Sequence, residues 1–540
     1  MPDLLEFVPE RASPDRSKIA LARWLGPTDL FDVGNAVDTD IRVLQPATGH
    51  RPDALFALPN GLTVIVATAR VRASVFQCFL LALAERFGQK PASTGRVSII
   101  DPDCGLAVVA AENDRSFVEE AARIWDRLCT GGSLAVVEAA TIPKLYGSKA
   151  RLTEFVWAAA AACLPDDVPI LDVMSGTGAV TRVLSRRFRV SANDANPYAV
   201  TLTQAQSLDF EDDAGLLRSR LRAVADENAD RLRKLTADAV FEEEGFFNND
   251  FDEGNRLRYV SFCANPVLPP LDRRPADGAP YQLCLRGYAN VYLGVAQAID
   301  ADSIRKAIDA ETQEGSQARI ICLAALLGAV SACNSGPHFA QPRGLNSVRA
   351  FKHVVERRAR SLRFEFERML DRYAARPRSG RAAPTTATDW PEALRHFAIH
   401  NLDDGERAVY IDPPYSKLQY SRYYHLLNTL VAYDYPPLSL TGRYPPVDQR
   451  FSSRFEYRAS SARKEFDRLF NACADIGATV VLSYSDTGFV PINDLVRQLG
   501  TRFARVHLLS ESIRHHAQGK PIARASAVTE FIIVARCPAP

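Results

Sequence analysis

The order of apolar runs predicts an α/β protein with an open, mostly parallel sheet covered by helices on both faces. A run at 168–173 enters a glycine turn and a helical stretch, and a second run follows at 190–193. The strand pattern returns at 408–411, followed by a helical stretch at 420–431 and the runs TVVLSYSD, ARVHLLSE and TEFIIVAR. Alternating strands and helices favour parallel β-α-β units, because the crossover helix covers the sheet.

Composition excludes several classes of protein. The formal net charge of +1 neither indicates nor excludes a nucleic-acid binder, because a local patch steers a polyanion. The ten cysteines include no C-x-x-C pair, so neither a zinc site nor a disulfide framework is expected, and we expect no metal. The first residues do not show the basic region and apolar region of a signal peptide, and no apolar run reaches the ~18 residues of a membrane span. The run at 320–333 predicts a buried helix, and we expect a cytoplasmic protein without membrane contact.

Four segments are expected along the chain. Residues 1–145 contain strand-like runs at 61–69, 95–100, 105–111 and 133–140, and they predict an N-terminal α/β domain of unknown role. Residues 146–208 and 386–540 would form the two halves of the main domain, separated by an insert at 209–385. Residues 209–253 of the insert are acidic, which favours solvated surfaces. Residues 343–381 are basic, with twelve Arg and Lys against four carboxylates. Residues 375–388 predict a loop.

A glycine turn marks the first half of a candidate site. Gly176 and Gly178 follow the strand that ends near Asp172, and the helix beginning near Ala179 directs its amide groups at the same space. Asp194 closes the second strand, where an acid commonly accepts hydrogen bonds from ribose hydroxyls. The turn lacks the third glycine of the dinucleotide fingerprint and no phosphate loop is present, so neither NAD nor ATP is favoured. A plain structural turn is the alternative.

The tetrapeptide Asp412-Pro413-Pro414-Tyr415 follows an apolar strand and supplies the second half. The Asp412 carboxylate and the Pro413 carbonyl can each accept one hydrogen from an exocyclic amino group such as adenine N6. The two prolines stiffen this acceptor loop, and Tyr415 offers an aromatic face for a base that has left its stack. The alternative is a rigid turn whose tyrosine packs in the core.

Together these motifs resemble the Dam-like (class alpha) DNA adenine-N6 methyltransferases, over residues 146–536. The resemblance implies S-adenosylmethionine as cofactor and a Rossmann-like methyltransferase sheet. It also places Asp172 near the methionine amino group, the glycines under the cofactor and Asp194 on its ribose. Gly147-Ser148-Lys149 looks like a family segment beside the cofactor, and Asp389-Trp390 is similar to a pair that contacts the cofactor adenine. The implied cofactor-binding residues are Lys149, Asp172, Ser175, Gly176, Thr177, Gly178, Asp194, Asp389 and Trp390.

The resemblance also implies a helical DNA-recognition insert beside the carboxyl edge of the sheet. The expected contacts with double-stranded DNA come from Arg343, Arg357, Arg358, Arg360, Tyr420 and Arg422. Two departures stand out. Met174 replaces an aromatic residue of many relatives, and residues 1–145 match nothing in compact members. That segment would be a partner-docking or recognition module, or a scaffold.

The expected activity is site-specific methylation of a flipped adenine at N6, as in restriction-modification. The nearest alternative is an RNA adenine-N6 methyltransferase, since the Asp-Pro-Pro-Tyr loop does not itself distinguish ribose from deoxyribose. N4-cytosine methylation ranks third, because the first loop residue of that class is commonly Ser rather than Asp412. A different class of protein is a catalytically inactive nucleic-acid-binding subunit of a defence complex.

Overall fold

A computed structural model describes most of the chain beyond Lys149. The described residues are 152–210, 213–269, 271, 278–376, 383–401, 405–414, 419–515 and 526–537, with only the backbone at 512–515, 526 and 527. Before Leu152 the structure describes the backbone of four strands and single residues, namely Val75, Cys78, Phe79, Leu81, Ala82, Arg123, Ile124, Arg127, Leu128 and Lys149.

A seven-stranded sheet forms the centre of the main domain, in the order β10-β11-β9-β8-β5-β6-β7. Its strands are β5 (Pro169–Asp172), β6 (Arg189–Asn193), β7 (Thr385–Thr386), β8 (Ala408–Ile411), β9 (Thr479–Ser485), β10 (Arg505–His515) and β11 (Ser526–Arg536). The strands from β9 to β7 are parallel, whereas β11 runs antiparallel to both β9 and β10. The prediction of a mostly parallel α/β sheet is therefore confirmed.

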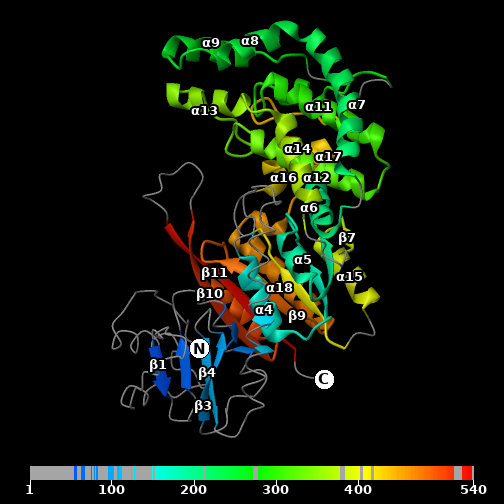
Figure 1. The fold of residues 1–540 in the computed structure, drawn as a ribbon. Helices are drawn as coiled ribbons and strands as arrows, with labels where there is room; N and C mark the ends of the chain where they lie inside the picture. Colours follow the sequence, from blue (N-terminus) through cyan, green and yellow to red (C-terminus); the bar gives the residue numbers. More distant parts are fainter. Residues whose placement is uncertain are drawn as a thin grey trace.

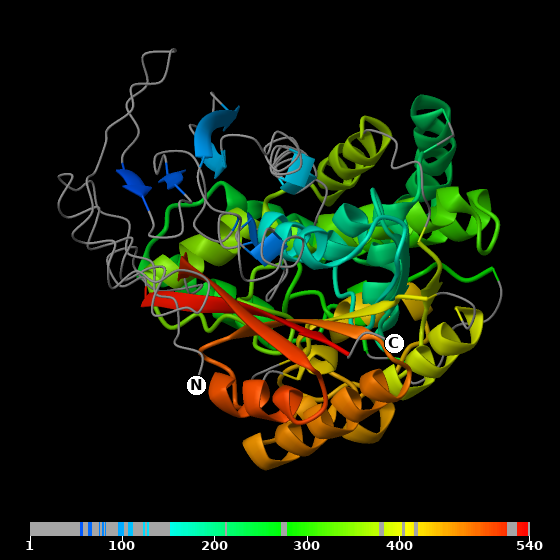
Figure 2. The same ribbon diagram turned by 90° about the horizontal axis from the view of Figure 1, so that it is seen from below.

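Helices cover both faces of this sheet, as Figures 1 and 2 show. Ile170, Tyr410 and Val481 point to one face and pack with α4 (Thr153–Cys163) and α5 (Ala179–Leu184). The neighbouring strand residues, such as Leu171 and Val409, point to the opposite face. There they pack with α15 (Trp390–His400), α18 (Ala459–Asp475) and α19 (Ile492–Gly500). Because both faces are buried, the strands read as continuous apolar runs rather than alternating ones.

A helical body lies beyond the carboxyl edge of the sheet, at the top of Figure 1. Its helices are α7 (Ala214–Leu235), α8 (Ala237–Phe247), α9 (Glu253–Ala264), α10 (Leu283–Gly287), α11 (Val295–Glu311), α12 (Gln317–Cys333), α13 (Val348–Arg358) and α14 (Leu362–Ala374). The buried helix expected at 320–333 is α12, at the centre of the apolar cluster. The cluster also takes in α6 (Pro197–Ser207) and α17 (His425–Ala432), which follows the short α16 (Tyr420–Tyr423). The segment after the Asp-Pro-Pro-Tyr loop thus belongs to the helical body as well.

Ion pairs join α7, which lies in the predicted acidic stretch, to α14, which lies in the predicted basic stretch. Arg222 of α7 pairs with Glu367 of α14 at 2.6 Å, and Arg218 pairs with Asp371. Arg363 pairs with Asp300 at 2.8 Å. The interpretation of residues 209–253 as solvated surface is therefore incomplete, because α7 faces α14 with complementary charges.

The expectation that Arg358 contacts DNA is wrong, because Arg358 is buried. Its side chain is only 4% exposed, and its guanidinium donates to the Tyr259 hydroxyl at 2.9 Å and lies over the same ring at 5.6 Å. Glu243 lies near enough to favour the charged guanidinium, and it also accepts hydrogen bonds from the start of α11. Arg358 is a structural cation inside the helical body, so it does not reach a phosphate.

The described N-terminal strands form a separate four-stranded antiparallel sheet. They are β1 (Ala54–Ala57), β2 (Thr63–Val66), β3 (Gly95–Asp101) and β4 (Leu106–Ala111), in the order β1-β2-β4-β3. Three of the strand predictions are confirmed, and the fourth, at 133–140, lies outside the described residues. Val75, Phe79 and Leu128 are buried in the same apolar cluster as α4, so these three residues pack against the main domain. In the described part of the chain, no helix has both the length and the hydropathy needed to cross a membrane.

Candidate active site

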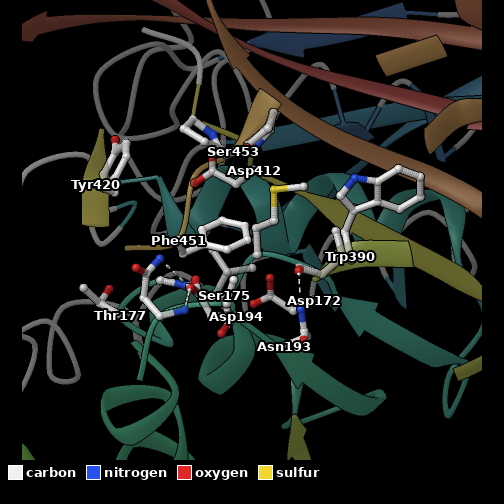
Figure 3. A pocket seen from close by; sticks show the side chains of 18 of the residues that line it. Asp172, Ser175, Thr177, Asn193, Asp194, Trp390, Asp412, Tyr420, Phe451 and Ser453 are labelled. Carbon is white, nitrogen blue, oxygen red and sulfur yellow. Dashed lines mark hydrogen bonds between the residues drawn. The ribbon is translucent and has the colours of Figure 1, made fainter. Parts of the chain in front are cut away.

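The carboxyl ends of β5 and β8 lie side by side at a topological switch point. The chain leaves β5 towards β6 on one side and returns as β8 on the other, so the loops after β5 and β8 diverge and leave a crevice. A cavity lies there (Figure 3), and both predicted motifs contribute to it. Its lining residues are Lys149, Asp172, Val173, Met174, Ser175, Gly176, Thr177, Ala179, Val180, Asn193, Asp194, Ala195, Asn196, Tyr198, Thr388, Asp389, Trp390, Tyr410, Asp412, Pro413, Pro414, Tyr420, Phe451, Ser453 and Glu456.

The glycine turn after β5 lines the cavity through Ser175, Gly176 and Thr177, whereas Gly178 is not among the lining residues. The Ser175 N–H donates to the Asn193 carbonyl at 2.8 Å, which joins the turn to the end of β6. Gly176 and Gly178 have φ of 56° and 74°, a region that residues with a Cβ adopt at a cost. A Cβ at Gly178 would lie 2.6 Å from the Thr203 Cα on α6, so the backbone approach itself requires glycine.

Replacing Gly178 should therefore disrupt the cavity. We expect Gly178→Ala to lower the free energy of unfolding by roughly 1–3 kcal/mol, through positive-φ strain and the contact with Thr203. We expect it also to weaken cofactor binding at least tenfold. Gly405→Ala is the matched control, because Gly405 has no positive φ and no atom within 4 Å of its Cβ position. Chemical denaturation and calorimetry measure both effects, and equal behaviour of the two variants would contradict the assignment.

Asp172 places a buried carboxylate at the end of β5. Its side chain is 0% exposed, and Oδ2 accepts a hydrogen bond from the Thr181 hydroxyl at 2.5 Å. Oδ1 is buried, and none of the residues that the structure describes makes a hydrogen bond to it. Burial raises the pKa of Asp172 to about 7, and the carboxylates of Asp412 and Asp194 add to the rise, whereas the Thr181 hydrogen bond opposes it. An unsatisfied carboxylate oxygen in a cavity wall suits a cationic ligand group.

Asp194 at the end of β6 supports the glycine turn. Its Oδ2 accepts the Gly176 N–H at 3.1 Å, and its Oδ1 accepts the Asn196 N–H at 2.9 Å. Burial raises the pKa of Asp194, while these backbone donors oppose the rise. Oδ1 also accepts the Asn196 side-chain amide at 3.2 Å, so the expected bond to a ribose hydroxyl would fall to Oδ2, as a second role beside this structural one.

A third segment completes the cofactor side of the cavity. The Asn193 side chain bonds Thr386 at 2.8 Å and the backbone of Thr388 at 2.9 and 3.1 Å, and so holds the approach to α15 against β6. This contact brings Asp389 and Trp390 into the cavity wall. The Trp390 indole N–H donates to Glu465 at 2.8 Å, which fixes the ring. The predicted pair thus lies at the cavity, as do Ser175 and Thr177.

The Asp-Pro-Pro-Tyr loop begins where β8 ends, facing the glycine turn. The Asp412 carboxylate has a side-chain exposure of 17% and lies 3.4 Å from the Lys149 ammonium. Burial raises the pKa of Asp412 to about 6, and Lys149 limits the rise. Pro413 and Pro414 also line the cavity, whereas Tyr415 lies outside the described residues.

Lys149 lines the cavity, but it contacts acidic side chains there. Its ammonium lies 3.1 Å from Glu530 of β11 as well as 3.4 Å from Asp412. Sequence reasoning missed Glu530. The available signal was one carboxylate inside the apolar run TEFIIVAR, because a charge in a buried strand requires a partner.

The wall opposite β5 comes from the segment between α17 and α18. Phe451, Ser453 and Glu456 line the cavity beside Tyr420, which Figure 3 labels together with the first two. Glu456 accepts the Tyr420 N–H at 2.9 Å and so fixes the start of α16. Burial raises the pKa of Glu456 to about 7, against hydrogen bonds from Tyr420 and Ser453. No motif in the sequence indicated Phe451, Ser453 or Glu456, whereas Tyr420 was an expected DNA contact.

Two arginines near this wall lie over tyrosine rings. Arg422 lies over the rings of Tyr423 and Tyr444 at 5.6 and 5.4 Å, and Arg450 lies over Tyr444 at 5.4 Å. In the part of the chain that the structure describes, no ion pair involves Arg343, Arg357, Arg360, Arg422 or Arg450. Arg357 donates to the Ala332 carbonyl at 3.0 Å. The described residues also contain no group of three or more His, Cys, Asp or Glu side chains suited to a metal ion.

Comparison with known proteins points to the same region. Residues 392–479, which include β8 and the Asp-Pro-Pro-Tyr loop, match the family of D12 class N6 adenine-specific DNA methyltransferases. The chain is also 43% identical over 98 residues to the modification methylase LlaI of Lactococcus lactis subsp. lactis. That match spans 18% of this chain and 14% of the relative. No solved structure matches significantly.

Proposed function

We propose that this protein is a site-specific DNA methyltransferase that methylates adenine at N6. The observation that carries the proposal is the cavity in which Asp412 of the Asp-Pro-Pro-Tyr loop faces the glycine turn after β5. The D12 class match over residues 392–479 supports the same chemistry, and similarity to a modification methylase favours a role in restriction-modification.

The residues of the glycine side fit S-adenosylmethionine. The orphaned Oδ1 of Asp172 can accept a hydrogen from the methionine ammonium. Gly176 lets the backbone approach a ligand closely, because a Cβ there would meet open space on the cavity side. When bound, S-adenosylmethionine supplies a methyl group on a positively charged sulfur. Asp389 and Trp390 lie where the resemblance expects the cofactor adenine.

The residues of the β8 side fit the amino group of the target base. The Asp412 carboxylate and the Pro413 carbonyl would each accept one N6 hydrogen, which orients the nitrogen lone pair. The same acceptors stabilise the positive charge that develops on N6, and Asp412 can take the proton that N6 loses. An adenine reaches this cavity only after leaving the helical stack, at a cost of a few kcal/mol. Tyr420 and Phe451 offer nearby aromatic faces.

The unpaired arginines beside α16 favour approach of a polyanion. We expect the double variant Arg422→Ala with Arg450→Ala to weaken duplex binding about tenfold at moderate salt, with a shallower salt dependence by about one to two units of slope. The matched control replaces Arg463 of α18 and Arg497 of α19 with alanine. It removes the same amount of charge, but these two arginines already pair with Asp494. Fluorescence anisotropy at several salt concentrations measures both. Equal losses in the two variants would argue against this surface.

The choice between DNA and RNA requires an activity assay. Purified protein, labelled S-adenosylmethionine, unmethylated duplex DNA and total RNA are combined, and the labelled nucleosides are then identified. We expect N6-methyladenine in DNA. Label confined to RNA would favour the RNA enzyme, and N4-methylcytosine would favour the third candidate. Binding of S-adenosylmethionine without transfer to any substrate would support an inactive nucleic-acid-binding subunit.

A further inference from the structure

A row of three buried charges runs from the catalytic loop to the last strand of the sheet. The Lys149 ammonium lies between the carboxylates of Asp412 and Glu530. Lys149 and Glu530 are only 6% and 4% exposed in their side chains, so water screens this row poorly. Glu530 lies opposite Ser485 where β11 and β9 are paired. The strand next to β9 is β8, and Asp412 follows directly after β8.

The ammonium is shared unequally by its two acidic neighbours. Lys149 Nζ lies 3.1 Å from Glu530 but 3.4 Å from Asp412, whereas charge-assisted hydrogen bonds usually span about 2.7–2.9 Å. Lys149 therefore donates its shorter hydrogen bond to Glu530 and contacts Asp412 through a longer ion pair. The Asp412 oxygens keep lone pairs for another donor.

Resting on the proposed function, we propose that Glu530 is a positioning residue that draws the Lys149 ammonium away from Asp412. Lys149 then keeps the catalytic carboxylate charged, while Glu530 keeps that carboxylate free to accept the N6 hydrogens. Without Lys149, burial would favour the neutral acid, whose hydroxyl donates instead of accepting. Without Glu530, the full attraction of Lys149 falls on Asp412, and the ammonium competes with the amino group of the base.

Other charged and titratable groups near Asp412 also affect its pKa. Glu530 raises the pKa of Asp412, opposite to Lys149. The Asp172 carboxylate on β5 and the Tyr410 hydroxyl on β8 also interact electrostatically with Asp412. Neither changes in the variants described below, so a shift between variants reports on Lys149 and Glu530.

The test compares the pH dependence of kcat in two single variants and their double variant. In Glu530→Gln we expect the acid limb of the pH profile of kcat to move down by about one pH unit, because a negative charge near Asp412 is lost. We also expect kcat at the plateau of the profile to fall about tenfold. In Lys149→Met we expect the acid limb to move up by about one unit. In the double variant the lost charges cancel, so the limb returns towards that of the wild type.

A second readout does not depend on turnover. Once the site is mapped, duplexes with adenine or purine at the target position are compared, since purine lacks the 6-amino group. We expect the preference for adenine in binding to fall several-fold in Glu530→Gln. Glu406→Gln is the matched control: it removes a carboxylate that pairs with Arg536 at the amino end of β8.

The outcomes separate this inference from the proposed function. A wild type that binds S-adenosylmethionine but never methylates DNA overturns the function. A wild type that methylates DNA, with single variants whose acid limbs stay in place or move in the same direction, overturns the positioning role. A double variant worse than both singles would indicate a merely structural contact, and would overturn it as well. Near-UV circular dichroism and thermal unfolding verify the fold of each variant.

Discussion

We expect Asp412→Ala to lower the rate of N6 methylation by on the order of 100- to 1000-fold, and to leave S-adenosylmethionine affinity unchanged within about threefold. The substitution removes the acceptor that orients the N6 lone pair and stabilises the charge that develops there, a loss of the size seen when one pre-organised polar partner is deleted. The cofactor side of the cavity, at Asp172 and the glycine turn, is left intact. Single-turnover methylation and calorimetry measure the two quantities.

The pH dependence of this variant tests the same assignment. Asp412 accepts hydrogen bonds at both oxygens and can take the N6 proton only when it is ionised, and its pKa is raised to about 6. The wild-type rate should therefore fall as the pH decreases through about 6, and the residual activity of Asp412→Ala should lack that dependence. A variant that retains more than about a tenth of the wild-type rate, with the same acid limb, would place the amino-group acceptor elsewhere.

Asp172→Asn weakens S-adenosylmethionine binding by about tenfold to a hundredfold, the range expected for losing one charged hydrogen bond. In the wild type the affinity should also decline as the pH falls through about 7, because protonation of Asp172 removes the charge that attracts an ammonium. The variant should lack this decline. Isothermal calorimetry between pH 5.5 and 8.5 measures both effects, with Asp166→Asn, an exposed carboxylate paired with Arg187, as the control.

The stability of the cofactor-free protein should change in the opposite direction. Because the folded-state pKa of Asp172 lies above its ordinary value, the folded state holds the proton more tightly than the unfolded chain. This favours folding most at low pH, and the benefit is lost as the pH rises from about 4 to about 7. Asp172→Asn removes the cost of the buried charge, so its free energy of unfolding should exceed that of the wild type at pH 8 but not at pH 4. A variant less stable at pH 8 would contradict this account.

Local signals in the sequence predicted much of the cavity. The glycine turn after β5 and the Asp-Pro-Pro-Tyr loop after β8 each follow a short apolar strand, and parallel strands bring their carboxyl ends to the same edge of a sheet. For this reason Asp172 and Asp412 could be assigned to one site although 240 residues separate them along the chain, as their numbers give.

Contacts between distant segments could not be predicted in this way. Lys149 and Glu530 are separated by 381 positions, and no spacing rule connects them. Arg358 looked available for DNA because its neighbours in sequence are basic, whereas its contact with Tyr259 depends on how α9 packs against α13. Similarly, β7 lies within a stretch expected to be a loop, because its strand pairing comes from β6 rather than from its own residues.

The most direct test of the central claim is nucleoside analysis of DNA from a host that lacks adenine methylation and expresses the full chain. The account predicts N6-methyladenine in DNA from cells that produce the wild type and none above background in cells that produce Asp412→Ala at the same level. N6-methyladenine absent from both, with a folded wild type that binds S-adenosylmethionine, would contradict the assignment of this cavity to DNA adenine methylation.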